Sequence, residues 1–143
     1  MVVKILIVDD SEDFRLITRL ALSSQEYEIL EASSGREALT LAREEQPTLI
    51  FLDILMPGLD GYETCRQLKT NSATSHIPII ILTALGDPLA RRKSQEAGAG
   101  DCITKPVTPQ ELRDLVKRFL RRYKLFHGAR RHVKGIDENK DQT

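Results

Sequence analysis

The stretch TLIFLDILMPGLDGYETCRQLK, residues 48–69, contains one complete unit of a strand followed by a helix. It opens with an apolar run of strand length, Thr48 to Leu52, that is continuous rather than alternating. Such runs are typical of strands buried on both faces. After Asp53 and a turn-rich segment, Tyr62, Cys65 and Leu68 recur every three residues, which predicts a helix with one core face. The stretch therefore predicts a buried strand, an acid at its end and a return helix.

The same unit recurs along the rest of the chain. Four more runs of strand length are found, at Val2–Val8, Tyr27–Ala32, Ile77–Leu82 and Asp101–Thr104. Segments with helical spacing separate them, and this alternation indicates right-handed crossovers that build a parallel sheet with helices on both faces. The chain is too short for the eight units of a (β/α)₈ barrel. We therefore predict an α/β fold with a doubly wound, five-stranded parallel sheet.

The helices have recognisable starts. Ser34 with Glu37 forms a capping box, and Asp87 before Pro88 is typical of an N-cap followed by proline. Thr108 and Pro109 open the last helix, which we place from Pro109 to about residue 126. In the first helix the expected core stripe consists of Phe14, Ile17, Thr18 and Ala21.

Composition limits the function classes. The formal net charge is zero, but residues 105–134 carry 10 Lys and Arg against 2 Asp and Glu, so any basic function belongs near the C-terminus. No apolar run reaches the roughly 18 residues that a membrane span requires, so we expect a cytoplasmic protein. Two cysteines, Cys65 and Cys102, are too few for a disulfide framework or a zinc site, and we expect both to be buried.

Strong polar groups follow the apolar runs. They are Asp9, Asp10, Asp53, Thr83 and Lys105. Because the carboxyl ends of parallel strands share one edge of the sheet, these side chains should converge there, where open α/β sheets bind their ligands. Three carboxylates repel one another unless a cation lies among them, and Mg²⁺ suits a few oxygen ligands at an open edge. With a lysine and a hydroxyl nearby, one carboxylate could be a nucleophile that carries an aspartyl phosphate.

At this point the chain resembles a known family. Over residues 2 to about 124 it is similar to the receiver domain of bacterial response regulators, of the chemotaxis type. The matching motifs are ILIVDDSED at 5–13, FLDILMPGLDG at 51–61, IIILTA at 79–84 and ITKP at 103–106. The resemblance implies a flavodoxin-like (βα)5 fold with sheet order 2-1-3-4-5.

The resemblance also implies a role for each matching residue. Asp53 would be the phospho-acceptor, and Mg²⁺ would be bound by Asp10, Asp53 and the backbone carbonyl of Leu55, with Asp9 acting mainly through a water. Thr83 and Lys105 would contact the phosphoryl group, and the Lys105–Pro106 bond would be cis. Met56, Pro57, Gly58 and Gly61 match the loop after the acceptor, where we expect glycine for its freedom to adopt positive φ.

Two positions suggest how this chain differs from its family. Leu55 and Leu85 flank the expected phosphoryl site and cannot orient a water by hydrogen bonding, so we predict slow self-dephosphorylation. Family members usually carry an aromatic ring at position 102. Cys102 is too small to replace that ring as a rotating switch, so the relay through this position should differ.

The function that follows is a phosphorylation-controlled switch without enzyme activity on other substrates. A histidine kinase or a phosphotransfer protein would donate the phosphoryl group, and an output protein would read it. One alternative is that the chain is the N-terminal receiver part of a longer DNA-binding or cyclase regulator. Another, a phosphatase with an aspartate nucleophile, fits less well because its DxD motif is missing from the first strand.

The C-terminal region suggests a protein contact. We divide the chain into a receiver domain, residues 1–126, and a basic then acidic flexible tail, residues 127–143. Tyr123, Leu125 and Phe126 with a rim of arginines predict an exposed apolar patch. The expected partner is a second copy, through the fourth helix, fifth strand and fifth helix, with Arg91 and Arg92 facing Asp101, Glu111 or Asp114 across the interface. Nucleic acid is disfavoured, because no second folded unit with a recognition helix is present in the basic stretch.

Overall fold

The computed structural model describes residues 3–23, 26–55, 60–84, 86 and 88–134, with side chains described as far as Arg122. By its internal contacts the chain divides into two compact units, residues 1–109 and 110–143.

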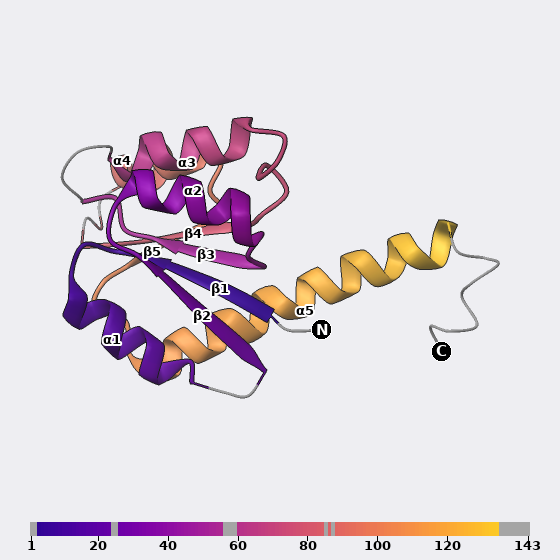
Figure 1. Cartoon of the computed structure of the whole chain (residues 1–143), viewed down its shortest axis with the longest axis horizontal. Coiled ribbons are helices and arrows are strands. Elements are labelled where there is room, and N and C mark those ends of the chain that lie inside the picture. Colours follow the sequence, from indigo (N-terminus) through magenta and orange to yellow (C-terminus); the bar gives the residue numbers. More distant parts are fainter. Residues whose placement is uncertain (1–2, 24–25, 56–59, 85, 87, 135–143) are drawn as a thin grey trace. The chain divides into compact units, whose positions relative to one another are not determined.

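The first unit is built on five parallel strands in the order β2-β1-β3-β4-β5, as predicted. The strands are β1 (Val3–Val8), β2 (Tyr27–Ala32), β3 (Leu49–Leu52), β4 (Ile79–Thr83) and β5 (Asp101–Thr104). The helices are α1 (Glu12–Ala21), α2 (Gly35–Glu45), α3 (Gly61–Thr70) and α4 (Pro88–Glu96). Figure 1 shows α2 and α3 on one face of the sheet and α1 on the other, which is the doubly wound arrangement.

The three central strands form the core because their side chains alternate between two covered faces. Every residue of β3 and β4 is buried, whereas the edge strands β2 and β5 are only partly buried. On one face, a cluster joins the strands to α2 and α3 through Leu6, Val8, Ile50, Leu52, Ile79, Ile81, Ala38, Ala42, Cys65 and Leu68. Cys65 and Cys102 are both buried, as expected.

Strand β4 begins later than its apolar run. We predicted residues 77–82, but the strand covers Ile79–Thr83. The N–H of Ile77 donates to the carbonyl of Thr74 in a turn, and Pro78 has no N–H, so pairing starts at Ile79. The strand ends one residue later than predicted, at Thr83.

Local capping fixes the helix starts. The side chains of Ser11, Ser34 and Asp60 accept backbone N–H groups at the first turns of α1, α2 and α3. Glu37 belongs to the predicted capping box, but its carboxylate accepts from the N–H of Ser33 rather than Ser34. The expected cap at Asp87 lies outside the described residues.

The predicted stripe of α1 is wrong at one position. Thr18 and Ala21 are buried and Phe14 is half-buried, but Ile17 is 51% exposed. The buried face is centred on Thr18, Ala21 and Leu22, and Ile17 lies to one side of it.

The second unit contains α5 (Pro109–Lys134) from its second residue onward. The helix begins at Pro109 as predicted, but its predicted end near residue 126 is wrong, because it continues to Lys134. Leu112, Leu115 and Val116 are buried and Phe119 is half-buried. The side chains of Tyr123, Leu125 and Phe126 lie outside the described ones. Within the described part of the chain, none of the helices combines the length and apolar character that crossing a bilayer requires.

Candidate functional site

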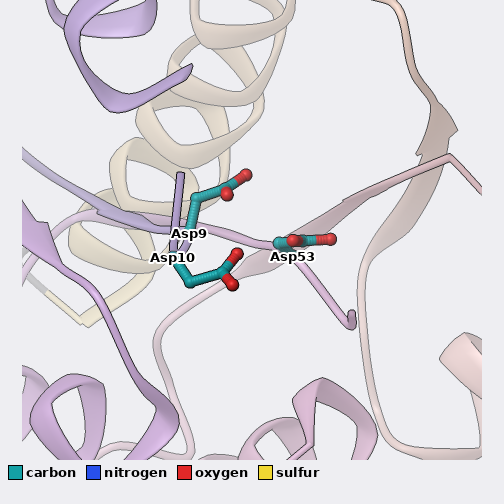
Figure 2. Close-up of side chains that lie close together, drawn as sticks. All are labelled: Asp9, Asp10 and Asp53. Atoms are coloured by element: carbon teal, nitrogen blue, oxygen red, sulfur yellow. The ribbon is translucent and has the colours of Figure 1, made fainter. Parts of the chain in front are cut away.

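Two neighbouring strand ends bring three carboxylates together. Asp9 and Asp10 follow β1, and Asp53 follows β3, where its N–H donates to the carbonyl of Val8 at 2.9 Å. One carboxylate oxygen from each residue lies within 4.8 Å of the others. Figure 2 shows the three carboxyl groups gathered in one region at the carboxyl edge of the sheet.

A lysine from a third strand end lies beside these acids. The Nζ of Lys105 is 2.7 Å from Oδ2 of Asp9 and 3.9 Å from Oδ2 of Asp53. The same ammonium lies 4.0 Å from the ring centroid of Phe14. The N–H of Lys105 donates to the carbonyl of Thr83 at 2.6 Å, and the Lys105–Pro106 peptide bond is cis. A single positive charge thus neighbours at least two of the three acids.

Two more residues singled out by the sequence, Thr83 and Leu55, form backbone hydrogen bonds with Lys105 and Asp53. Thr83 ends β4 at the same edge and is fully buried. The N–H of Leu55 donates to Oδ1 of Asp53 at 3.2 Å, while the Leu55 residue itself is 52% exposed. Cys102 lies within β5 opposite Ile81 and is buried. Leu85, Met56, Pro57 and Gly58 lie outside the described residues.

The three acids have different surroundings. Asp9 is 2% exposed, and its carboxylate accepts from the N–H of Ser11 and from Lys105. Asp53 is 6% exposed. Asp10 is exposed, and none of the described residues donates a hydrogen bond to its carboxylate. Asp10 and Asp53 therefore have oxygen atoms open to a cation, and hard carboxylate oxygens are what Mg²⁺ prefers.

Burial dominates the acid–base behaviour of Asp53. Loss of solvent raises the pKa of this carboxyl, and the charges of Asp9 and Asp10 raise it further. The N–H of Leu55 and the ammonium of Lys105 act in the opposite direction. A cation bound among the three acids would compensate for the cost of burying the charged Asp53 carboxylate and would offset the repulsion from Asp9 and Asp10.

Gly61 permits a close approach between helix α3 and the segment that carries Asp53. A Cβ at this position would lie 2.3 Å from Cα of Ile54 and 2.6 Å from the carbonyl oxygen of Asp53. We expected glycine here for a positive φ, but among the described glycines only Gly98 has one. Glycine is therefore needed at position 61 because a Cβ has no room there, and not because of its φ angle.

Sequence reasoning missed two contacts of α1 with the site. Phe14 was expected only as a core residue, yet its ring faces Lys105. Arg15 was not singled out, yet it donates to the backbone carbonyl of Asp9 at 2.7 Å. The only available signal was their position in the first turn of a helix that begins beside two acids.

A five-stranded sheet of this order, with carboxylates and a lysine at its carboxyl edge, defines a class of small signalling domains with the CheY-like flavodoxin fold. The family model described as the response regulator receiver domain matches residues 5–117, and the chain belongs to this family. It is a receiver domain of two-component response regulators, a regulatory phospho-acceptor domain.

Known proteins support this assignment. The chain is 46% identical over 119 residues to the probable transcriptional regulator ycf27 of Cyanophora paradoxa, covering 83% of this chain and 48% of that protein. It is 45% identical over 119 residues to the transcriptional regulatory protein ResD of Bacillus subtilis, again covering 83% and 48%. The solved chemotaxis response regulator CheY4 of Vibrio cholerae is similar with a TM-score of 0.78 and 30% identity, over 83% of this chain and 99% of that one. The chain thus spans about half the length of the curated relatives it matches.

Proposed function

We propose that this chain accepts a phosphoryl group on Asp53 from a histidine kinase or a phosphotransfer protein. The observation that carries the proposal is the grouping of Asp9, Asp10 and Asp53 with Lys105 at one sheet edge. Among the three acids, Asp53 combines burial with an oxygen that Lys105 can approach. Asp9 is already engaged by Lys105 and Ser11, and Asp10 is exposed.

Each residue has a task in this reaction. An oxygen of Asp53 attacks phosphorus while the P–N bond to the donor imidazole breaks, and the imidazole nitrogen keeps the electron pair. Lys105 moves from Asp9 toward the phosphoryl oxygens, and the hydroxyl of Thr83 donates to them. Asp10, Asp53 and the carbonyl of Leu55 would hold Mg²⁺, and Asp9 would act through a water. When bound, Mg²⁺ neutralises negative charge on the phosphoryl oxygens.

The test is a labelling experiment with the full chain, Mg²⁺ and acetyl phosphate. Intact-mass and peptide mass spectrometry should find one acid-labile phosphoryl group on Asp53, and Asp53→Asn should abolish it. Asp60→Asn is the matched control, because Asp60 is an exposed helix cap and asparagine also caps helices. Label on another residue, or undiminished label without divalent metal, would overturn the assignment.

The names and lengths of the relatives suggest what this receiver domain controls. Because ycf27 and ResD are named as transcriptional regulators and are about twice as long as the matched region, this chain could serve as the receiver part of a longer regulator. We also propose that the protein is cytoplasmic and that its receiver domain ends near residue 126. A homodimer through α4, β5 and α5 is a further proposal, although Asp101 already lies 4.0 Å from Arg91 of the same chain.

A further inference from the structure

Helix α1 contacts the acidic turn through an arginine that the reaction above does not use. Nη1 of Arg15 donates to the backbone carbonyl oxygen of Asp9 at 2.7 Å, and its Nε donates to Oε1 of Glu31 at 3.1 Å. The side chain of Arg15 is only 15% exposed. One guanidinium therefore joins the end of β1 to the end of β2.

A second arginine holds the other oxygen of Glu31. Arg19, one turn further along α1, donates from Nη1 to Oε2 of Glu31. Both carboxylate oxygens of Glu31 are thus occupied, and Arg19, Glu31, Arg15 and the Asp9 carbonyl form a continuous chain of contacts. Because the guanidinium group is planar and rigid, its N–H groups point in fixed directions, and Glu31 sets the angle at which Arg15 meets the Asp9 carbonyl.

This carbonyl belongs to the peptide that links Asp9 to Asp10. None of the described residues donates a hydrogen bond to the Asp10 carboxylate, so its direction depends on its own backbone. By contrast, the carboxylate of Asp9 is held by Ser11 and Lys105, and that of Asp53 is held by the N–H of Leu55. Asp10 is therefore the acid whose position relies most on the orientation of this peptide.

We propose that Arg15 is a positioning residue for Mg²⁺ binding: anchored by Glu31, it holds the Asp9–Asp10 peptide so that the Asp10 carboxylate faces Asp53. The proposal rests on the proposed function, since it assumes that these acids bind the ion. Charge alone predicts the opposite effect of removing Arg15, because a cation near two carboxylates opposes the binding of another cation. The sign of the change in Mg²⁺ affinity therefore separates positioning from simple electrostatics.

The experiment measures Mg²⁺ binding to the full chain by titration calorimetry, without any phosphodonor. Outer contacts that orient metal ligands are typically worth about 10- to 100-fold in affinity, so Arg15→Met should raise the Kd for Mg²⁺ roughly tenfold. Arg15→Lys keeps the charge but loses the planar guanidinium, whose N–H groups bind Asp9 and Glu31 together, so it should also weaken Mg²⁺ binding. Arg19→Met should have a smaller effect in the same direction. In acetyl phosphate kinetics, the Arg15 variants should need more Mg²⁺ but reach the wild-type rate at saturation.

Lys4→Met is the matched control. Lys4 lies on β1 at the end away from the site and forms a comparable ion pair with Glu45 at 3.1 Å, so its loss should leave Mg²⁺ affinity unchanged. Unchanged or tighter Mg²⁺ binding in Arg15→Met would overturn the proposal. If Arg15→Met does not fold by circular dichroism, Arg15→Lys and Arg19→Met decide the question in the same way. Wild-type protein that binds no Mg²⁺ would instead contradict the proposed function, so the two failures are distinguishable.

Discussion

The surroundings of Asp53 shift the pKa of its carboxyl in both directions. Burial has the largest effect and raises this pKa, which makes the stability of the fold depend on pH. Well below the ordinary value of 3.8, the carboxyl is protonated in both the folded and the unfolded chain, so it contributes no pH dependence. As the pH rises through the raised pKa, the folded state must carry a buried charge that the unfolded state carries in water. The native state binds the extra proton, and stability therefore falls with rising pH in this window.

We predict that Asp53→Asn is more stable than the wild type at neutral pH without divalent ions. The Tm should rise by a few degrees, because the amide removes a desolvated charge next to Asp9 and Asp10. The difference should shrink as the pH falls toward the ordinary value of the carboxyl. Thermal melts at several pH values measure it, with Asp60→Asn as the exposed control. A stability gain that does not change with pH would contradict this account of Asp53.

Gly61→Ala should damage both stability and the site. The added Cβ would overlap backbone atoms of Asp53 and Ile54, which cannot move independently of the acceptor. Overpacking typically costs about 1–3 kcal/mol, and we expect a loss in this range by urea denaturation together with slower labelling of Asp53. Gly98→Ala is the comparison. Gly98 has a φ of 97°, which strains any residue with a Cβ, but the new Cβ would meet the flexible side chain of Lys69 rather than the backbone of the site. This variant should lose stability and keep the labelling rate per folded molecule. Equal labelling rates in the two variants would show that Gly61 serves the fold alone.

At the scale of elements, the caps of α1 and α2 offer a matched pair. Ser11 and Ser34 both accept a backbone N–H at the first turn of their helix. Replacing either serine by alanine should cost about 1 kcal/mol of stability. Ser11→Ala should also weaken Mg²⁺ binding: alanine keeps the backbone N–H that donates to Asp9, but loss of the cap loosens the first turn of α1, which holds Phe14 and Arg15. Calorimetry checks the difference, and an equal Mg²⁺ affinity in both variants would argue against coupling through α1.

The existence and order of the elements could be predicted from the sequence because burial leaves a local signature. The runs of β3 and β4 are apolar on both faces, and Ser34 and Pro109 mark helix starts. Helix α1 was less predictable at Ile17, since one apolar residue beside a buried face leaves the same pattern as one within it. The predicted end of α5 near residue 126 is wrong because glycine has a low helix propensity and Gly128 favours an earlier end, whereas the helix continues through it to Lys134.

The acids and the lysine of the site were predictable because parallel strands place their ends at one edge. The contacts between their side chains were not, because they join residues far apart in the chain. The sequence carries no periodic signal that pairs Lys105 with Asp9, or Arg15 with Glu31. Such contacts depend on the register of β1 against β2 and on the rotation of α1, which only the folded structure defines.

For the whole molecule, ion binding and folding should be coupled. The apo protein holds three carboxylates close together, and an ion that binds only the folded state stabilises it by mass action. At about 100 times its Kd, Mg²⁺ should add roughly 2.7 kcal/mol and raise the Tm measurably. Asp10→Asn should remove most of this increase, because Asp10 has the most exposed carboxylate of the three. Differential scanning fluorimetry over a Mg²⁺ series measures it, with Ca²⁺-free buffers. A full Mg²⁺ response in Asp10→Asn would exclude this residue as a ligand.

The amino edge of the parallel sheet lies at the opposite end of the strands from Asp9, Asp53 and Thr83. The segment 71–78 leads into the start of β4, at the end opposite Thr83, and Ser72 there is exposed. The chain has only two cysteines, both buried, and burial raises the pKa of the Cys65 thiol to about 11. Ser72→Cys would therefore offer a maleimide dye one reactive attachment point. Tethered there to a surface or labelled for single-molecule fluorescence, the protein would present its acidic edge unobstructed to any partner in solution.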